Sequence, residues 1–286
     1  MYGNYQKILL LKFQEIFNVG DFLKSFFGKI APLRIFLPNF VSVLLFGDRQ
    51  QWGLVPDYDD PSWKEWERLN SEIYLATQQT GVGASVCSAG YKILKHVEIN
   101  QKKILEIGPG RIAHTVYWRE GMPKEYVVAD RRPEMLSEAR QVLEGKSCEV
   151  KGVLLPSEDM WVLPFDDASF DLVVSFYSLE HLYPLDHYVR ELARVLRVGG
   201  RLVGAIPTEG GMAWGLGRYF TTRRYFKKKT TIDPDKIICW EHPNYSDHVL
   251  SVLDHYFYKI EKHFWPSVIP LIDLNLIVSF IYQKGK

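Results

Sequence analysis

The residues best suited to chemistry begin with Glu106, which stands in an apolar run and is followed by Gly108 and Gly110. The run predicts a strand, and the glycines after it let the backbone approach a ligand closely. Residues 112–120 predict a helix whose first N–H groups would face the same ligand. A carboxylate beside this turn would repel a pyrophosphate but hold a ribose hydroxyl or an ammonium group. The same pattern also fits a dinucleotide-binding turn or a plain strand–helix turn.

Three later segments help to decide which ligand this turn would bind. Asp130 ends a second predicted strand about 20 residues further on, the spacing at which a carboxylate reaches both hydroxyls of a ribose. Asp159 precedes the apolar loop 160–165, so its side chain could accept from an exocyclic amine while the loop covers a flat base. Residues 170–176 predict a buried strand, which the segment 177–181 follows directly.

In this order, the motifs resemble those of the class I S-adenosylmethionine-dependent methyltransferases, in particular the group that modifies small molecules. The acid-x-Gly-x-Gly pattern of that family stands at 106–110, Asp-x-x-x-Leu-Pro-Phe at 159–165 and Phe-Asp-x-Val-x-Ser at 170–175. The likeness covers roughly residues 85–207 and the C-terminal strands more loosely. It implies S-adenosyl-L-methionine as the cofactor and leaves the methyl acceptor undefined.

The resemblance also implies roles for individual residues. Glu106 and the two glycines would frame the amino-acid end of the cofactor, Asp130 would hold the ribose, and Asp159 with Met160 the adenine. The predicted cofactor-binding residues are Glu106, Gly108, Gly110, Asp130, Arg131, Asp159, Met160, Ser175 and Phe176.

Alternation of strands and helices predicts an α/β fold with a mostly parallel, Rossmann-like sheet. The last strands are expected to form a hairpin, which gives a seven-stranded sheet whose final strand is antiparallel. That ending is typical of methyltransferases and disfavours an NAD-binding fold. The expected strands are 103–107, 126–130, 149–155, 171–176, 201–206, 258–264 and 274–281, and the expected core helices are 112–120, 133–143 and 185–196.

A hydroxyl acceptor usually needs a general base, and histidine is the side chain best suited to that role near neutral pH. His181 follows the fourth strand directly, and His242 lies between the fifth strand and the last helix, next to Glu241. Both are predicted catalytic residues, with His181 preferred. The alternatives are a histidine that binds the next helical turn and a loop histidine with an acidic neighbour.

Residues 208–246 form an insertion that is long for a connection, as in a substrate lid. Cations alternate with aromatics at 217–229, a pattern that could bind phosphate and stack on rings. A phosphorylated, nucleotide-linked or lipid-linked acceptor would suit it, whereas a solvated amphipathic helix is the alternative. The predicted substrate residues are Tyr177, Arg218, Arg223, Arg224 and Trp240.

Residues 1–84 are expected to form an amphipathic, helical extension before a methyltransferase domain at 85–286. Phenylalanines and lysines stud residues 1–50, but the apolar stretches are too short to span a bilayer. This segment could be a lid, a homodimer interface or a peripheral membrane contact.

Overall composition limits the function further. The net charge of +1 disfavours nucleic acid as a partner. Three widely spaced cysteines indicate reduced thiols in a cytoplasmic protein, for which association with a membrane stays open, and no metal site is expected. The predicted function is methyl transfer to a hydroxyl of a small molecule or of a glycan- or lipid-linked intermediate. Alternatives are C- or N-methylation, a non-catalytic S-adenosylmethionine-binding partner protein, and an NAD-dependent oxidoreductase.

Overall fold

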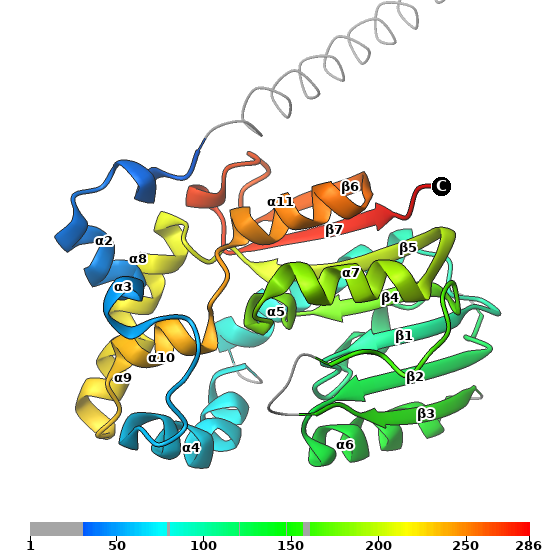
Figure 1. Cartoon of the computed structure of the whole chain (residues 1–286), viewed down its shortest axis with the longest axis horizontal. Helices are drawn as coiled ribbons and strands as arrows, with labels where there is room; N and C mark the ends of the chain where they lie inside the picture. The colour runs from blue at the N-terminus through cyan, green and yellow to red at the C-terminus, as the bar shows by residue number, and fades with distance from the viewer. Residues whose placement is uncertain (1–30, 79–80, 120, 147, 157–160) are drawn as a thin grey trace, which may run out of the picture.

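The computed structural model describes residues 31–78, 81–119, 121–146, 148–156 and 161–286. Two predicted cofactor residues, Asp159 and Met160, lie outside these ranges, as does most of the predicted membrane-binding segment 1–50. The centre of the chain is a seven-stranded sheet in the order β3-β2-β1-β4-β5-β7-β6 (Figure 1).

The predicted sheet is confirmed. Strands β1 to β5 pair in parallel, and β7 runs antiparallel to both of its neighbours, β5 and β6. Each strand lies within a few residues of its expected range, except that β5 begins five residues earlier. The strands are β1 (Lys103–Ile107), β2 (Glu125–Asp130), β3 (Glu149–Leu154), β4 (Phe170–Phe176), β5 (Leu196–Pro207), β6 (Tyr258–Trp265) and β7 (Ile277–Gln283).

Helices cover both faces of the sheet, because its central strands carry apolar side chains on both sides. On β4, Val173 faces the core under α7 and α11, whereas Leu172 and Val174 face the core under η2 and α6. The covering helices are α5 (Gly81–Tyr91), η2 (Lys92–His96), α6 (Pro133–Glu144), α7 (Leu185–Val195) and α11 (Ser246–Tyr256).

The helix expected at 112–120 is wrong. Only the short 3-10 helix η3 (Ala113–Tyr117) forms there, after Ile112 in the left-handed region with φ 45°. A left-handed residue breaks the right-handed path that an α-helix would need. The turn after β1 therefore lacks the N-terminus of an α-helix, and its ligand contacts must come from the turn itself.

The insertion between β5 and α11 is helical and packs against the N-terminal helices. Helix α2 contacts α8, while α3 and α4 contact α10, so segments far apart in sequence form one helical layer. In Figure 1 the parallel strands point toward this layer. Its elements are η1 (Leu33–Phe36), α2 (Asn39–Phe46), α3 (Arg49–Trp52), α4 (Pro61–Gln78), α8 (Met212–Phe220), α9 (Thr222–Lys229) and α10 (Pro234–Glu241).

The predicted boundary between residues 84 and 85 falls inside α5, a continuous helix. Two short elements complete the structure, η4 (Leu179–His181) after β4 and η5 (Ile272–Leu274) before β7. Within the ranges that the structure describes, no helix is both long and apolar enough to cross a membrane.

Candidate functional site

The glycine turn after β1 forms one wall of the site. Gly108 has φ +64° and Gly110 φ +50°, the left-handed conformation that glycine adopts without strain. A Cβ on Gly108 would lie 2.7 Å from Cβ of Ser178. Glycine is therefore required here both by backbone conformation and by the close approach of the segment after β4.

Two residues beside this turn are strained. Ile112 and Tyr177 both have positive φ, at 45° and 56°, a conformation that costs a β-branched or bulky residue of the order of 1–3 kcal/mol. Ile112 follows β1 and Tyr177 follows β4, so both lie at the carboxyl edge of adjacent strands. Strain of this kind clusters at functional sites, which supports a ligand site at this edge.

Glu106 on β1 is buried beneath the turn, with 1% of its surface exposed. Its Oε1 lies 2.9 Å from Nε2 of His114, and its Oε2 accepts from the hydroxyl of Tyr126 at 2.7 Å. Trp118 donates to Nδ1 of His114, so the imidazole proton sits on Nε2 and points to Glu106. Both carboxylate oxygens are thus engaged within the protein, and Glu106 ties β1, β2 and η3 together.

Asp130 ends β2 and is 4% exposed. Its Oδ1 accepts from the backbone N–H of Arg132 at 2.9 Å, but its Oδ2 is buried without a hydrogen-bond partner. An unpaired buried carboxylate oxygen is costly, so such an atom is ordinarily satisfied by a ligand or water. The ribose hydroxyl that the family resemblance assigns to Asp130 fits this free oxygen. Arg131, beside it, is exposed.

Two serines join the glycine turn to the segment after β4. The hydroxyl of Ser178 donates to the carbonyl of Ile107 at 3.0 Å, so Ser175 donates to Ser178 across their 2.6 Å contact. Phe176 is buried between Tyr91 and His114. Of the predicted cofactor residues that the structure describes, Gly108, Gly110, Asp130 and Ser175 therefore gather at this edge.

His181, at the end of η4, is the first of two predicted bases. Its Nδ1 donates to the backbone carbonyl of Glu241 and lies 3.4 Å from Oε2 of the same residue. Burial would lower its pKa, but the bond and charge of Glu241, with the charge of Glu180, raise the pKa to about 9. A pKa above neutrality favours the protonated imidazole, which is less suited than a neutral one to accept a proton.

His242 is the second predicted base, and its ring centroid lies 4.7 Å from that of His181. Burial, with the nearby charges of His181 and Arg218, lowers its pKa to about 4 despite Glu209. Its Nδ1 lies 3.2 Å from Oε2 of Glu209. The contact lacks hydrogen-bond geometry, and Nδ1 has no hydrogen-bond partner, but the negative charge of Glu209 favours a proton on Nδ1 over one on Nε2. His242 is the neutral member of the pair.

Three glutamates surround the histidine pair, and none was among the predicted site residues. Glu209 is fully buried and accepts from Arg218 and Trp214, so its pKa lies well below the usual range although burial opposes this. Glu241 accepts from Trp66. Glu180 is 2% exposed, and its Oε2 lacks a hydrogen-bond partner.

The charge states of these carboxyls differ. Burial raises the pKa of Glu180 to about 7, with Glu209 adding to the rise and His181 opposing it. For Glu241 burial acts in the same direction, but the bonds and charge of His181 and the bond from Trp66 outweigh it and lower the pKa to about 2. Glu180 is thus the one carboxyl of the three that can gain or lose a proton near neutral pH.

A pocket that is partly open to solvent lies beside Glu241 and His242, within the helical layer, and its empty space of about 380 Å³ includes some of that solvent. Its wall includes Trp66 from α4, Arg218 and Phe226 from the insertion, and Glu241 and His242. The insertion therefore does contribute to a cavity, together with the N-terminal helices.

The predicted substrate residues have mostly structural contacts. Arg218 is paired with Glu209, and Arg223 with Asp235 and the carbonyl of Leu44. The charge of each guanidinium is therefore balanced by a carboxylate within the protein, while both residues also line the pocket. The remaining three are Trp240, buried and bonded to the carbonyl of Trp52, Tyr177, bonded to the carbonyl of Cys87, and Arg224, exposed over the ring of Phe220.

Comparison with known proteins covers the centre of the chain. Residues 105–204 match a family model described as a methyltransferase domain. The demethylmenaquinone methyltransferase of Thermus thermophilus is 35% identical over 103 residues, which are 36% of this chain and 46% of that protein. The malonyl-[acyl-carrier protein] O-methyltransferase of Erwinia pyrifoliae is 32% identical over 125 residues, 43% and 44% of the two chains. The matched part thus spans about half or less of each relative.

Solved structures agree with the fold. An S-adenosylmethionine-dependent methyltransferase from Mesorhizobium loti superposes with a TM-score of 0.50 at 17% identity, covering 69% of this chain and 98% of that one. A protein of Pyrococcus horikoshii gives a TM-score of 0.51 at 17% identity, with 77% and 99% coverage. At this identity the likeness establishes the sheet and its helices, and it does not extend to the acceptor.

Proposed function

We propose that this chain, which contains a class I S-adenosylmethionine-dependent methyltransferase domain with S-adenosyl-L-methionine as its cofactor, methylates a hydroxyl of a small molecule. The observation that carries the proposal is the position of His242, whose Nδ1 lies 3.2 Å from Oε2 of Glu209. It lies on the wall of the cavity, with Glu209 behind it. A glycan- or lipid-linked acceptor would need to present its hydroxyl at the same place.

The carboxyl edge of the sheet would hold the cofactor. The backbone of Gly108 and Gly110 would contact it closely, and Oδ2 of Asp130 would accept from a ribose hydroxyl. When bound, the cofactor supplies a methyl group that its sulfonium makes electrophilic. The protein must then mainly align the acceptor oxygen with that group, and such positioning can contribute about 7–11 kcal/mol in ideal cases.

His242 would act as the general base. As the acceptor oxygen bonds to the methyl carbon and the carbon–sulfur bond breaks, its proton would pass to Nε2 of His242. The charge of Glu209, 3.2 Å from Nδ1, would offset part of the cost that burial and the charges of His181 and Arg218 impose on the imidazolium. His181 is already protonated and would instead hold Glu241 in place. The base role predicted first for His181 thus moves to its neighbour.

Other proposals differ in the reacting atom or in the presence of catalysis. Relatives include proteins named as C-methyltransferases and as O-methyltransferases, so carbon and nitrogen acceptors remain alternatives for this chain. A non-catalytic S-adenosylmethionine-binding partner protein is a further alternative. The terminal antiparallel strand β7 argues against an NAD-dependent oxidoreductase.

The first experiment is calorimetric titration of the full chain with S-adenosylmethionine, S-adenosylhomocysteine and NAD. We expect the first two to bind and NAD to give no heat. Transfer is then measured with methyl-tritiated cofactor against fractionated small-molecule and lipid extracts, and mass spectrometry locates the methyl group. Label on carbon or nitrogen would refute the hydroxyl acceptor, and binding without transfer to any fraction would favour the non-catalytic alternative.

Variants separate the roles in the same assay. His242→Ala should keep cofactor affinity and lose transfer about 100-fold or more, the usual contribution of a positioned base. His255→Ala, an exposed histidine on α11, is the matched control and should behave as wild type. Normal transfer by His242→Ala would show that the hydroxyl needs no base from this residue.

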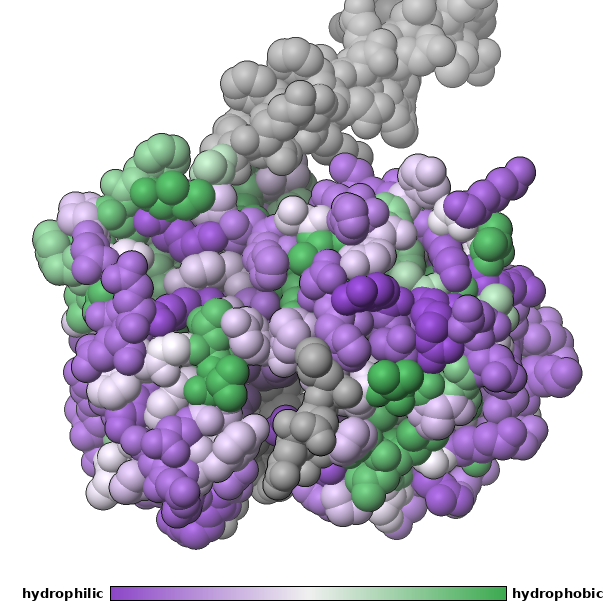
Figure 2. All heavy atoms as spheres, in the orientation of Figure 1, coloured by the Kyte–Doolittle hydropathy of each residue, from purple (hydrophilic) through white to green (hydrophobic). Residues whose placement is uncertain are grey.

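We also propose contact between a lipid surface and η1 with α2. Leu33, Ile35, Phe36, Phe40 and Leu44 are exposed there, Phe36 by 73% and Phe40 by 76%, and Figure 2 shows this patch in green. Helix α9, linked to α2 through α8, adds the exposed cations Arg224 and Lys227–Lys229. Exposed apolar side chains are typical of surfaces that lie on membranes, and the cations of α9, elsewhere on the same layer, would favour anionic lipids.

Vesicle flotation tests this contact. The full chain should float with phosphatidylserine-containing vesicles, less with neutral ones, and a Phe36→Ser, Phe40→Ser variant should stay in the soluble fraction. Light scattering of the same samples detects a homodimer, the competing use of the patch. A dimer that the double substitution dissociates, without flotation, would replace the membrane proposal.

Reduced thiols at Cys87, Cys148 and Cys239 suit the proposed cytoplasmic location.

A further inference from the structure

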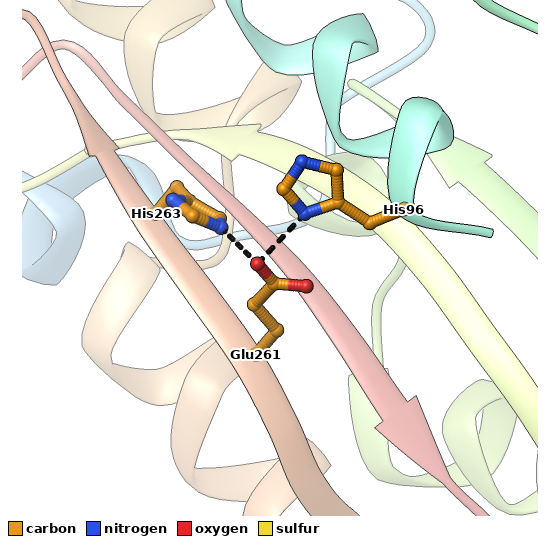
Figure 3. A group of neighbouring side chains, drawn as sticks. All are labelled: His96, Glu261 and His263. Carbon is orange, nitrogen blue, oxygen red and sulfur yellow. Dashed lines mark hydrogen bonds and ion pairs between the residues drawn. The ribbon is translucent and has the colours of Figure 1, made fainter.

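Two histidines and a glutamate meet at the edge of the sheet, apart from the cavity and the glycine turn. His96 ends η2, while Glu261 and His263 lie two residues apart on β6 and therefore project from the same side of that strand. Figure 3 shows the two imidazoles converging on one carboxylate oxygen. The distances to Oε1 of Glu261 are 2.8 Å from Nδ1 of His96 and 2.5 Å from Nε2 of His263.

We propose that His96, Glu261 and His263 bind a divalent transition-metal ion, with Zn²⁺ as the best-matched ion. Their three nearest ligand atoms all lie within 4.8 Å of one another. Two imidazole nitrogens and one carboxylate oxygen suit zinc, whereas magnesium and calcium prefer oxygen ligands alone. Water would take the fourth position of the tetrahedron.

The geometry requires only small adjustments. Zinc at about 2.0–2.2 Å from each ligand keeps tetrahedral ligand atoms roughly 3.3–3.6 Å apart, so the carboxylate must withdraw by about 1 Å or less. The side chains of His96, Glu261 and His263 are 46%, 31% and 51% exposed, so solvent-facing space is available for that movement. The two ring nitrogens already face the space that the carboxylate would share with the ion.

The ion would join two elements that the sequence keeps far apart. His96 is 165 residues from Glu261, so no ligand spacing was visible in the sequence and no metal was expected. Strand β6 is the last strand of the sheet and pairs only with β7 among the described strands. A bound ion would fix η2 to this edge and stabilise it.

Zinc titration of the metal-free full chain tests the proposal. We expect one site by calorimetry in buffer without phosphate. His96→Ala, Glu261→Gln and His263→Ala should each weaken it at least about tenfold, since loss of a ligand should cost no less than loss of a supporting residue. His255→Ala removes an exposed histidine outside the cluster and should leave zinc affinity unchanged.

Thermal unfolding gives an independent readout. Zinc should raise the Tm of wild type and of His255→Ala, and should leave the Tm of Glu261→Gln unchanged. Unchanged affinity in any of the three ligand variants would overturn the site and place zinc elsewhere, for example at His181 and His242. No binding up to millimolar zinc would show that the cluster is only a hydrogen-bonded trio.

Discussion

The sheet edge and the helical layer build their halves of the site in opposite ways. At the edge, Gly108, Asp130 and Ser175 each belong to a short motif at a strand end, and the fold needs only parallel pairing to bring them together. In the helical layer the partners are distant in sequence. Trp66 is 175 residues from Glu241, its hydrogen-bond acceptor, and His181 is 60 residues from the carbonyl of Glu241.

The two halves also use charge differently. The edge presents the backbone of the glycine turn and one unpaired carboxylate oxygen on Asp130. A ligand can therefore bind at that oxygen without breaking an internal contact. The helical layer cancels most of its buried charges in pairs, such as Glu209 with Arg218 and Asp235 with Arg223. An acceptor bound there, as we propose, would therefore be recognised mainly by the shape of the pocket and by His242 on its wall.

The largest expected effect comes from breaking the helical layer at Glu209. Glu209→Ala leaves the 9%-exposed side chain of Arg218 without its partner, and breaking a buried pair in this way costs about 3–5 kcal/mol. Urea unfolding of the variant measures the loss. Asp59→Ala removes the exposed partner of Lys64 and should give no measurable change. Equal effects of the two variants would contradict the role assigned to the buried pair.

The next prediction concerns the proton on Glu180. Its pKa rises from 4.5 unfolded to about 7 folded, so its contribution to stability is complete below pH 4.5 and is lost as pH rises through 7. Glu180→Gln mimics the protonated form. The variant should match wild type near pH 4 and exceed it by up to roughly 3 kcal/mol at pH 8.

Unfolding free energies of both proteins at pH 4, 6 and 8 test this, because the titration of other groups cancels in the difference. A difference that stays constant with pH would mean that Glu180 keeps an ordinary pKa. Glu180 would then no longer distinguish the helical layer from the sheet edge by titrating near neutral pH.

Asp130→Asn tests the sheet edge alone. The amide keeps the shape of the side chain and removes the negative charge that would accept from a ribose hydroxyl. Affinity for S-adenosylhomocysteine should fall by about 1.5–3 kcal/mol, the range for hydrogen bonds to charged groups, as measured by calorimetry. His242→Ala should leave that affinity unchanged. Equal losses in the two variants would erase the distinction between the halves.

The smallest effect is expected from Trp66→Phe. The substitution removes only the N–H that donates to Glu241 and keeps an aromatic ring against Phe226. Stability should fall by about 1.5 kcal/mol or less in urea unfolding, because His181 still pairs with Glu241. A loss as large as that of Glu209→Ala would mean that Trp66, rather than the ion pairs, organises the helical layer.

The sequence predicts the sheet edge better than the helical layer. The strands could be predicted because apolar runs between turns are local signals. The position of Asp130 could be predicted with them, because it is the last residue of one such run. The helix at 112–120 was wrong because a left-handed Ile112 leaves no local signature. The sequence suggests Arg218 and Arg223 as phosphate ligands. It does not show their pairing with Glu209 and Asp235, because these residues become neighbours only after folding.

Ser178 touches both halves, since its hydroxyl bonds to the carbonyl of Ile107 and its chain continues within three residues to His181. Ser178 is therefore placed to couple the proposed cofactor site and the proposed acceptor site. Thermodynamic linkage requires that if cofactor strengthens acceptor binding by some factor, acceptor strengthens cofactor binding by the same factor. A substitution at Ser178 should therefore change both factors equally. The affinity for one ligand would then depend on whether the other ligand is bound.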